Sequence, residues 1–441
     1  MLTINNPQIR PLIRSRYSWA EIRALSAFLE ERRTLEFAPL PNGLFPAAAL
    51  GSDKSFTGYS YVWVRDNIYI AYAHWAVGRA ATATQTVRTL MQYFIKHRRR
   101  FVDIIEGRSD PAVPMNRPHV RFDGRTLEEV NEKWAQAQND ALGYFLWLFC
   151  KLVNDQRLSP SPDDLEMLGL FPLYFRAIRF WEDEDSGHWE ETRKVSASSI
   201  GGGIAGLREF GELISKPQHA GKHQASAISP DLVRSLVQRG REALDSILPA
   251  ECVQADPAKR RPYDSALLFL IYPLQVVEGE MAEIILGRVR AHLQGEYGIR
   301  RYLGDSYWAP DYKRKLSPQQ RTADYSDNLS RRDQLLPAVG QEAQWCIFDP
   351  IVSCIYAARF QGTHQEADLA EQTEYLNRSL GQITSDDCPH APPFRCPELY
   401  YLERGRYVPN DHVPLLWTQA NLMLSLKLME ESCRLAGSDG K

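Results

Sequence analysis

Two adjacent carboxylates directly follow a tryptophan in the segment Asp185–Glu191, which reads DSGHWEE. Cleavage of a glycosidic bond requires a carboxylic acid beside the bond, and an aromatic side chain gives a sugar ring a wall to lie against. Either Glu190 or Glu191 could be that acid. The alternative is a solvated acidic turn, because the acidic run Glu182–Asp185 comes just before.

Acid-catalysed sugar hydrolysis needs a second carboxylate, and the best candidate is Glu398 in the segment CPELYYLERG. A surface glutamate would be unusual between Pro397 and Leu399, with two tyrosines following. Glu403 is close by and is the second candidate. If one carboxyl group is the acid and the other activates a water, the two should stand roughly 6.5–9.5 Å apart to leave room for that water.

The aromatic string YSYVWVRD ends where a helix is expected to begin. Alternate side chains of an extended segment face the same way, so Tyr59, Tyr61 and Trp63 would form one aromatic surface. Arg65 and Asp66 then supply several hydrogen-bond donors and two acceptors side by side, which suits the hydroxyl groups of a hexose. The alternative is an N-terminal aspartate that stabilises its own helix, with the arginine as its partner.

Three further strings combine aromatic, amide and charged side chains: WAQAQND, GIRRYLGDSYW and EAQW. The first directly precedes an apolar helix, where polar groups must face a cleft or be satisfied internally. A helix cap made by the Asn or Asp is the alternative there. The candidate sugar contacts, in chain order, are Tyr59, Trp63, Arg65, Asp66, Trp134, Gln138, Asp140, Trp189, Glu191, Arg301, Asp305 and Tyr307.

Composition narrows the class of protein. The 441 residues carry a formal net charge of -3, which gives no case for a nucleic-acid partner. The one basic run, Lys96–Arg100, closes an apolar-periodic helix, where cations complement the helix dipole. No apolar run reaches membrane-spanning length, and the N-terminus has no apolar core of a signal peptide.

The 7 cysteines are odd in number, and several stand in strongly apolar stretches. We interpret them as reduced thiols of a cytoplasmic protein. Cys388, His390 and Cys396 come close together, but a zinc site would need a fourth ligand and none is evident. We therefore expect no metal and no cofactor.

Helical periodicity dominates the chain. Helices are expected near 19–33, 67–97, 126–154, 163–181, 197–215, 231–247, 263–275, 279–294, 341–361, 365–380 and 413–434. Some of these segments are amphipathic and others are apolar nearly all round, and the latter must be buried on every side. This alternation indicates an inner ring of helices wrapped by an outer ring, while convincing strand patterns are scarce. Long connecting segments remain, and long ordered loops are usually functional.

Taken together, the strings resemble glycoside hydrolase family 15, the glucoamylase family, and the related N-terminal domain of the phosphorylase kinase alpha and beta regulatory subunits. The resemblance covers nearly the whole chain. YSYVWVRD, WAQAQND, DSGHWEE, RRYLGDSYW and PELYY with PLLWTQA occur in the family's order. The resemblance implies an all-α (α/α)6 toroid with the site at one mouth. The motifs run from about residue 50 to 430. We expect the toroid to occupy 1–441 as a single domain, with a core of about 19–434 and no separate β-sandwich or starch-binding domain.

The resemblance also implies an inverting, exo-acting hydrolase that releases glucose from non-reducing ends of α-glucans or oligosaccharides. Glu190 would protonate the glycosidic oxygen, and Glu398 would deprotonate a water on the opposite face. Arg65 and Asp66 would grip the terminal glucose, and Arg301 would hold the sugar beyond the scissile bond. Burial against Trp189 and the charge of Glu191 are expected to raise the pKa of Glu190.

One departure favours a second hypothesis. The family's base is commonly followed by a polar residue, whereas Leu399 follows Glu398 here. Strings such as VRDNIY and SSIGGGIAGL are at least as similar to the kinase-subunit branch, which implies sugar binding without hydrolysis. The alternative function is therefore a non-catalytic regulatory protein that senses a glucan.

Overall fold

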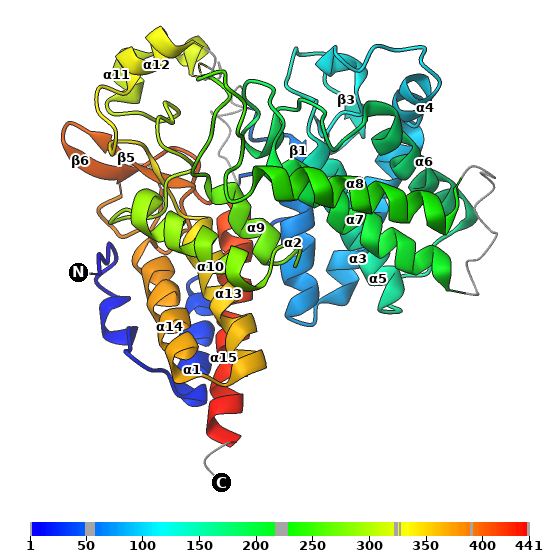
Figure 1. The fold of residues 1–441 in the computed structure, drawn as a ribbon. Helices are drawn as coiled ribbons and strands as arrows, with labels where there is room; N and C mark the ends of the chain where they lie inside the picture. The colour runs from blue at the N-terminus through cyan, green and yellow to red at the C-terminus, as the bar shows by residue number, and fades with distance from the viewer. Residues whose placement is uncertain are drawn as a thin grey trace.

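The computed structural model describes residues 2–48, 58–216, 228–321, 325, 328–388 and 391–438. Helices make up most of this part of the chain (Figure 1). The α-helices are α1 (Trp19–Glu31), α2 (Val64–Ala76), α3 (Ala80–Lys96), α4 (Arg99–Ile105), α5 (Asn139–Asn154), α6 (Pro162–Ile178), α7 (Ala197–Ser215), α8 (Pro230–Ile247), α9 (Leu268–Ile271), α10 (Gly279–Arg288), α11 (Tyr312–Lys315), α12 (Leu329–Leu335), α13 (Phe348–Thr363), α14 (Glu366–Gly381) and α15 (Leu416–Ser438).

Six of these helices form a closed inner ring. Helix α2 packs on α5, α5 on α7, α7 on α9, α9 on α13, α13 on α15, and α15 returns to α2. Helices α1, α3, α6, α8, α10 and α14 pack outside them, so outer and inner helices alternate along the chain. The fold is an (α/α)6 toroid, as the sequence predicted.

Burial explains which helices lie inside. In α5 every residue from Asn139 to Cys150 is buried, whereas α8 buries only one stripe. The buried positions of α8 recur at the three- and four-residue spacing of an amphipathic helix. They are Val233, Leu236, Gly240, Leu244 and Ile247.

Helices α5 and α7 approach each other closely through glycines. A Cβ built on Gly143 would lie 2.3 Å from the carbonyl carbon of Gly202, and one on Gly206 would lie 2.7 Å from the carbonyl oxygen of Gly143. The small-residue run SASSIGGGIAG is therefore needed for this backbone contact. It brings the N-terminal ends of the two helices, with their polar residues, together.

In the part of the chain that the structure describes, two small antiparallel sheets complete the fold. Strands β1 (Val62–Trp63), β2 (Arg121–Asp123) and β3 (Glu128–Glu129) form one sheet. Strands β4 (Gln344–Trp345), β5 (Leu399–Glu403) and β6 (Arg406–Pro409) form the other. The labelled strands lie at the upper end of the helices together with α11 and α12, and the C-terminus lies at the lower end (Figure 1).

Several expected boundaries were wrong. The segment 67–97 is two helices, α2 and α3, because the chain turns at Gly78 with a φ of 86°. The segment 126–154 is helical only from Asn139, because its first residues belong to β3 and a loop. Within 263–275 only α9 is α-helical, because Pro273 lacks an N–H and holds Tyr272 extended.

Within the described residues, no helix is both long and apolar enough to cross a lipid bilayer. All seven cysteines are free, and six of them are buried. His390 lies outside the described residues. Among those described, no group of three or more His, Cys, Asp or Glu side chains is arranged to hold a metal ion.

Candidate functional site

A cavity of about 360 Å³ opens at the end of the toroid where the inner helices begin. Its walls come from the segments that lead into α2, α5, α7, α13 and α15, and from the long connection between α10 and α13. The helix N-termini therefore surround the cavity with partly positive dipole ends. The lining residues include Tyr59, Trp63, Arg65, Asp66, Trp134, His188, Trp189, Glu190, Glu191, Arg301, Tyr302, Asp305, Tyr307, Trp308, Trp345, Glu398, His412 and Trp417.

Most of the residues that the sequence singled out lie in this one cavity. Gln138 and Asp140 do not line it, but they stand behind Arg65 and hold it. Glu403 is at the end of β5, bonded to the Tyr401 hydroxyl, and is not part of the wall. Of the two candidates for the second carboxylate, only Glu398 therefore faces the cavity.

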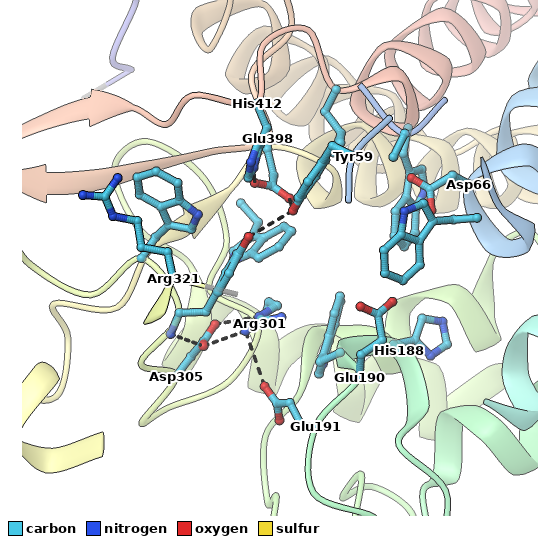
Figure 2. Close-up of a pocket in the computed structure, with 18 of the residues that line it drawn as sticks. Tyr59, Asp66, His188, Glu190, Glu191, Arg301, Asp305, Arg321, Glu398 and His412 are labelled. Atoms are coloured by element: carbon cyan, nitrogen blue, oxygen red, sulfur yellow. Dashed lines mark hydrogen bonds and ion pairs between the residues drawn. The ribbon is translucent and has the colours of Figure 1, made fainter. Parts of the chain in front are cut away.

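A closed turn presents Glu190 to the cavity. The backbones of Asp185 and Lys194 exchange hydrogen bonds of 3.0 and 2.9 Å, which closes the turn at its base. Glu190 follows the short 3-10 helix Gly187–Trp189 and has a φ of 59°. A non-glycine residue in this left-handed region is strained and persists only where its surroundings hold it. Here the strained backbone projects the carboxyl group into the cavity (Figure 2).

The walls of the cavity shield Glu190 from water, and only 20% of its side chain is exposed. This desolvation raises the pKa of Glu190 to about 7, and the nearby charge of Asp66 adds to the rise. Arg65 opposes the shift, with its Nη1 at 3.2 Å from Glu190 Oε1. The sequence had assigned the neighbouring-charge effect to Glu191, and this assignment was wrong. The carboxylate of Glu191 is compensated by cations of its own, so Asp66 is the neighbouring carboxylate that matters most.

Arg65 is buried and donates hydrogen bonds to several residues of the site. Its Nε donates to Asp140 Oδ2 at 2.6 Å, and its Nη2 donates to Gln138 Oε1 at 2.8 Å and to the carbonyl of Gly187 at 3.1 Å. Strand β1 and the first turn of α2 place Arg65 and Asp66 at the cavity wall. Asp66 is also buried, which raises its pKa to about 7 despite the attraction of Arg65.

Glu191 points away from Glu190 into a basic corner. Burial alone would raise its pKa, but Arg301, Arg261 and Lys194 together hold it below its usual range. The Tyr302 hydroxyl donates to Glu191 Oε1 at 2.5 Å, and Arg301 Nη2 lies 3.4 Å from the same oxygen. The two adjacent glutamates therefore favour opposite forms, because burial favours the protonated carboxyl of Glu190 and three cations favour the ionised carboxylate of Glu191.

Arg301 is fixed on one side by a carboxylate and on the others by aromatic rings. Its Nε and Nη2 each donate to Asp305 at 2.7 Å. Its guanidinium carbon lies 4.7 Å from the ring centre of Trp345 and 5.2 Å from those of Trp189 and Tyr307. Such cation–π contacts and the paired hydrogen bonds give it one orientation.

Glu398 lies across the cavity from Glu190, next to strand β5 (Figure 2). The Tyr59 hydroxyl donates to its Oε1 at 2.6 Å, and His412 Nδ1 lies 2.8 Å from its Oε2. The Asn410 amide also donates to Oε2. Strand β5 is itself held between β4 and β6, so the carboxylate is positioned by both backbone and side chains.

Several residues in or behind the cavity wall were missed or left unassigned by sequence reasoning. Trp345 and Trp417 stood in the noted strings EAQW and PLLWTQA, but the sequence did not assign them to the site. His412 and Asn410 gave a weaker signal, a polar pair just before the last apolar helix. Asp264 accepts a hydrogen bond from Trp189 Nε1 at 3.0 Å and had no recognisable signal at all.

The helical toroid with a carboxylate-lined mouth defines a glycosidase-type fold. Residues 33–312 match the model of glycosyl hydrolases family 15, and the chain belongs to that family. A structure described as a wild-type glycosidase has the same fold, with a TM-score of 0.63 and 16% identity, over 93% of this chain and 97% of that chain. A bacterial glucoamylase complexed with acarbose is similar in fold with a TM-score of 0.57 and 14% identity, over 89% of this chain and 53% of that chain.

Among curated proteins, the chain is similar to the liver isoform of the phosphorylase b kinase regulatory subunit alpha from Takifugu rubripes. The two are 26% identical over 310 residues, which is 64% of this chain and 24% of that protein. This chain therefore spans about a quarter of the length of that relative. The similarity to both branches that the sequence indicated is confirmed.

Proposed function

We propose that the protein is an inverting, exo-acting α-glucoside hydrolase that releases glucose from α-glucans or oligosaccharides. One observation carries the proposal: two glutamates, Glu190 and Glu398, face one cavity from opposite walls, in different surroundings. Membership of the family and the similarity in fold to a glucoamylase complexed with acarbose support the substrate class.

Glu190 is the proposed general acid. With a pKa raised to about 7, its carboxyl group keeps its proton at mildly acidic and near-neutral pH. A protonated carboxyl can donate to the glycosidic oxygen as the bond breaks. Arg65 would then stabilise the carboxylate that forms, because its Nη1 is already 3.2 Å away.

Glu398 is the proposed general base. It would take a proton from a water that attacks the anomeric carbon on the face opposite to Glu190, which inverts the configuration. Tyr59, Asn410 and His412 hold the carboxylate in one orientation for this role. Glu403 has no place in this scheme, because it does not line the cavity.

The remaining cavity residues are the proposed sugar contacts. Arg65 and Asp66 would bind the hydroxyl groups of the terminal glucose through paired donors and acceptors. Arg301 and Glu191 would bind the sugar beyond the scissile bond. The indole rings would form the apolar walls of the subsites, with Trp63, Trp134, Trp189, Trp345 and Trp417 as the candidates.

Two broader expectations remain part of the proposal. The chain would act as a single domain, since one continuous core cluster runs from the first helix to the last. The seven free cysteines fit a cytoplasmic protein, where thiols stay reduced. No cofactor, nucleic acid or membrane partner enters the proposed reaction.

A second candidate function is glucan sensing without turnover. The observation in its favour is the 26% identity to a kinase regulatory subunit over 64% of this chain. In this case the same cavity would bind sugar, and the carboxylates would serve as ligands only.

One experiment separates the two functions. The protein is incubated with maltose, isomaltose and longer α-glucans, and proton NMR follows the anomers of released glucose. The proposed hydrolase yields β-glucose first, and Glu190→Gln abolishes this release. Sugar binding without release of glucose would favour the sensing function instead.

A matched substrate tests the two roles separately. α-Glucosyl fluoride has a leaving group that needs no protonation, so Glu190→Gln should still hydrolyse it. Glu398→Gln should fail on both the fluoride and maltose, because the water still lacks its base. Equal losses of both substrates in both variants would contradict the assignment of roles.

A further inference from the structure

The imidazole of His412 contacts both the proposed base, Glu398, and Tyr59, which also bonds to that base. Its Nδ1 lies 2.8 Å from Glu398 Oε2. Its ring stacks on Tyr59 with 3.5 Å between ring centres and 18° between planes. The Trp308 ring lies nearly perpendicular to it, with 5.9 Å between ring centres. The residue is 4% exposed. These contacts leave the ring a single orientation (Figure 2).

The bonding pattern determines which atom carries the proton. An ionised carboxylate can only accept hydrogen bonds, so Nδ1 of His412 must be the protonated nitrogen when Glu398 acts as a base. The Asn410 amide nitrogen lies 3.2 Å from Nδ1 and is also a donor. Both groups therefore donate to the same oxygen, Glu398 Oε2.

The two oxygens of Glu398 are thereby made unequal. Each carboxylate oxygen has two lone-pair sites. The donors from Asn410 and His412 occupy both sites on Oε2. Among the residues that the structure describes, Oε1 receives only the Tyr59 hydroxyl. The Tyr59 oxygen in turn lies 3.0 Å from the Tyr307 hydroxyl. Within that described part of the chain, one lone-pair site, on Oε1, has no donor.

We infer that His412 is a positioning residue that, together with Asn410, blocks Glu398 Oε2 and makes Oε1 the atom that accepts the proton of the attacking water. This inference rests on the proposed hydrolase function and deepens it. His412 itself does not touch the substrate's reacting atoms in this scheme. It acts through the orientation of the base.

Each bond that forms in this reaction is matched by a bond that breaks. The water O–H bond breaks, its proton moves to Oε1, and the water oxygen bonds to the anomeric carbon. The bond between that carbon and the leaving oxygen breaks with its electron pair on the oxygen, which takes the proton of Glu190. Glu398 ends protonated and Glu190 ionised, and exchange with solvent restores both.

Two substitutions distinguish the effect of the Nδ1 hydrogen bond from the effect of ring stacking. His412→Phe keeps an aromatic ring to stack on Tyr59 but removes the Nδ1 donor. His412→Asn loses the stacking but offers an amide N–H near the position of Nδ1. We expect His412→Phe to lower kcat by about tenfold to a hundredfold with little change in KM, since an orienting hydrogen bond to a charged group is lost. His412→Asn should retain kcat within a few-fold.

Thermal unfolding of both variants is the control for a purely structural role. A His412→Phe variant with wild-type kcat, or one that loses activity only through KM, would overturn the inference. So would equal losses of kcat in the Phe and Asn variants, because the donor would then not be the property that matters.

An NMR measurement tests, independently of turnover, whether Nδ1 of His412 carries the proton. Nitrogen-15 spectra of the full chain, compared with His412→Phe to assign the signal, should show a proton on Nδ1 of His412. Its proton resonance should shift in Glu398→Gln. An unprotonated Nδ1 would overturn the inference even in an active enzyme. If the wild-type chain releases no glucose, the hydrolase function fails, while this spectrum still tests the positioning bond.

Discussion

At the scale of single residues, the adjacent pair Glu190 and Glu191 divides into two different groups. Glu190 has a strained backbone, a desolvated carboxyl group and Asp66 nearby, and the last two favour its protonated form. Glu191 sits among Arg301, Arg261 and Lys194, which favour its ionised form. The two side chains leave the turn in different directions, so each meets a different set of charges (Figure 2).

The activity should fall on the alkaline side of about pH 7. The pKa of Glu190 is raised from 4.5 to about 7, so the proton donor is present below pH 7 and decreases about tenfold per pH unit above it. The measurement is kcat/KM for maltose between pH 4 and 9. α-Glucosyl fluoride is the control, since it needs no proton and should lack this limb. A limb shared by both substrates would contradict the assignment.

Asp66→Asn should move this alkaline limb to lower pH. The pKa of Asp66 is itself raised to about 7, so Asp66 gains its negative charge over the same pH range as Glu190. That charge raises the pKa of Glu190, and an amide removes it. The absolute activity should also fall, because Asp66 is a proposed glucose contact, so the pH profile is normalised to its own maximum. An unmoved or upward-moved limb would show that Asp66 does not set the acidity of Glu190.

At the scale of elements, the contact between α5 and α7 positions much of the site. Helix α5 carries Asp140 in its first turn, and the turn with Glu190 lies just before α7. Their close approach depends on glycines, since a Cβ on Gly202 would lie 3.1 Å from the Cα of Asp140. A bulkier residue at this contact would move Asp140, which holds Arg65, away from the proposed acid Glu190.

Gly143→Ala should destabilise the protein by about 1–3 kcal/mol, because its methyl group would overlap the backbone of Gly202 at 2.3 Å. The measurement is the free energy of unfolding in urea. Gly362→Ala in α13 is the matched control, because a Cβ there meets nothing within 4 Å. That control should be neutral or stabilising by up to about 1 kcal/mol. Equal effects in both variants would refute the packing argument.

At the scale of the whole molecule, the inner ring closes through α15 against α2. These helices come from opposite ends of the chain, and α1 also packs on α15. Every inner helix thus packs against two other inner helices. If one of them unfolded, the apolar surfaces of both neighbours would be exposed to water. The core forms one continuous cluster for the same reason.

We therefore expect the chain to unfold in a single cooperative thermal transition, as a single domain would. The measurement is calorimetry, in which the calorimetric and van't Hoff enthalpies should agree. Deletion of residues 416–438 should abolish this transition rather than shift it, because the ring would be open. Two separate transitions in the full chain would contradict the single-domain organisation.

The class of fold and most of the candidate site could be predicted from the order of residues alone. Apolar-all-round helices such as α5 alternate with amphipathic ones such as α8, and this pattern already requires one layer inside another. The aromatic and charged strings marked Arg65, Glu190, Arg301 and Glu398, since such polar groups next to apolar helices must face a cleft. Periodicity indicates which face of each segment is buried and therefore the layered arrangement. The choice of Glu190 over Glu191 as the acid came from the resemblance to glycoside hydrolase family 15.

The interactions between the site residues became visible only in the folded chain. The roles of Asp140 behind Arg65, of Asp264 beneath Trp189 and of His412 on Glu398 depend on distances between separate segments of the chain. The choice of Glu398 over Glu403, and of Asp66 as the main carboxylate neighbour of Glu190, has the same origin. Electrostatic effects fall off with distance in space rather than along the sequence, so folding has to bring the charges together before their acidities are set.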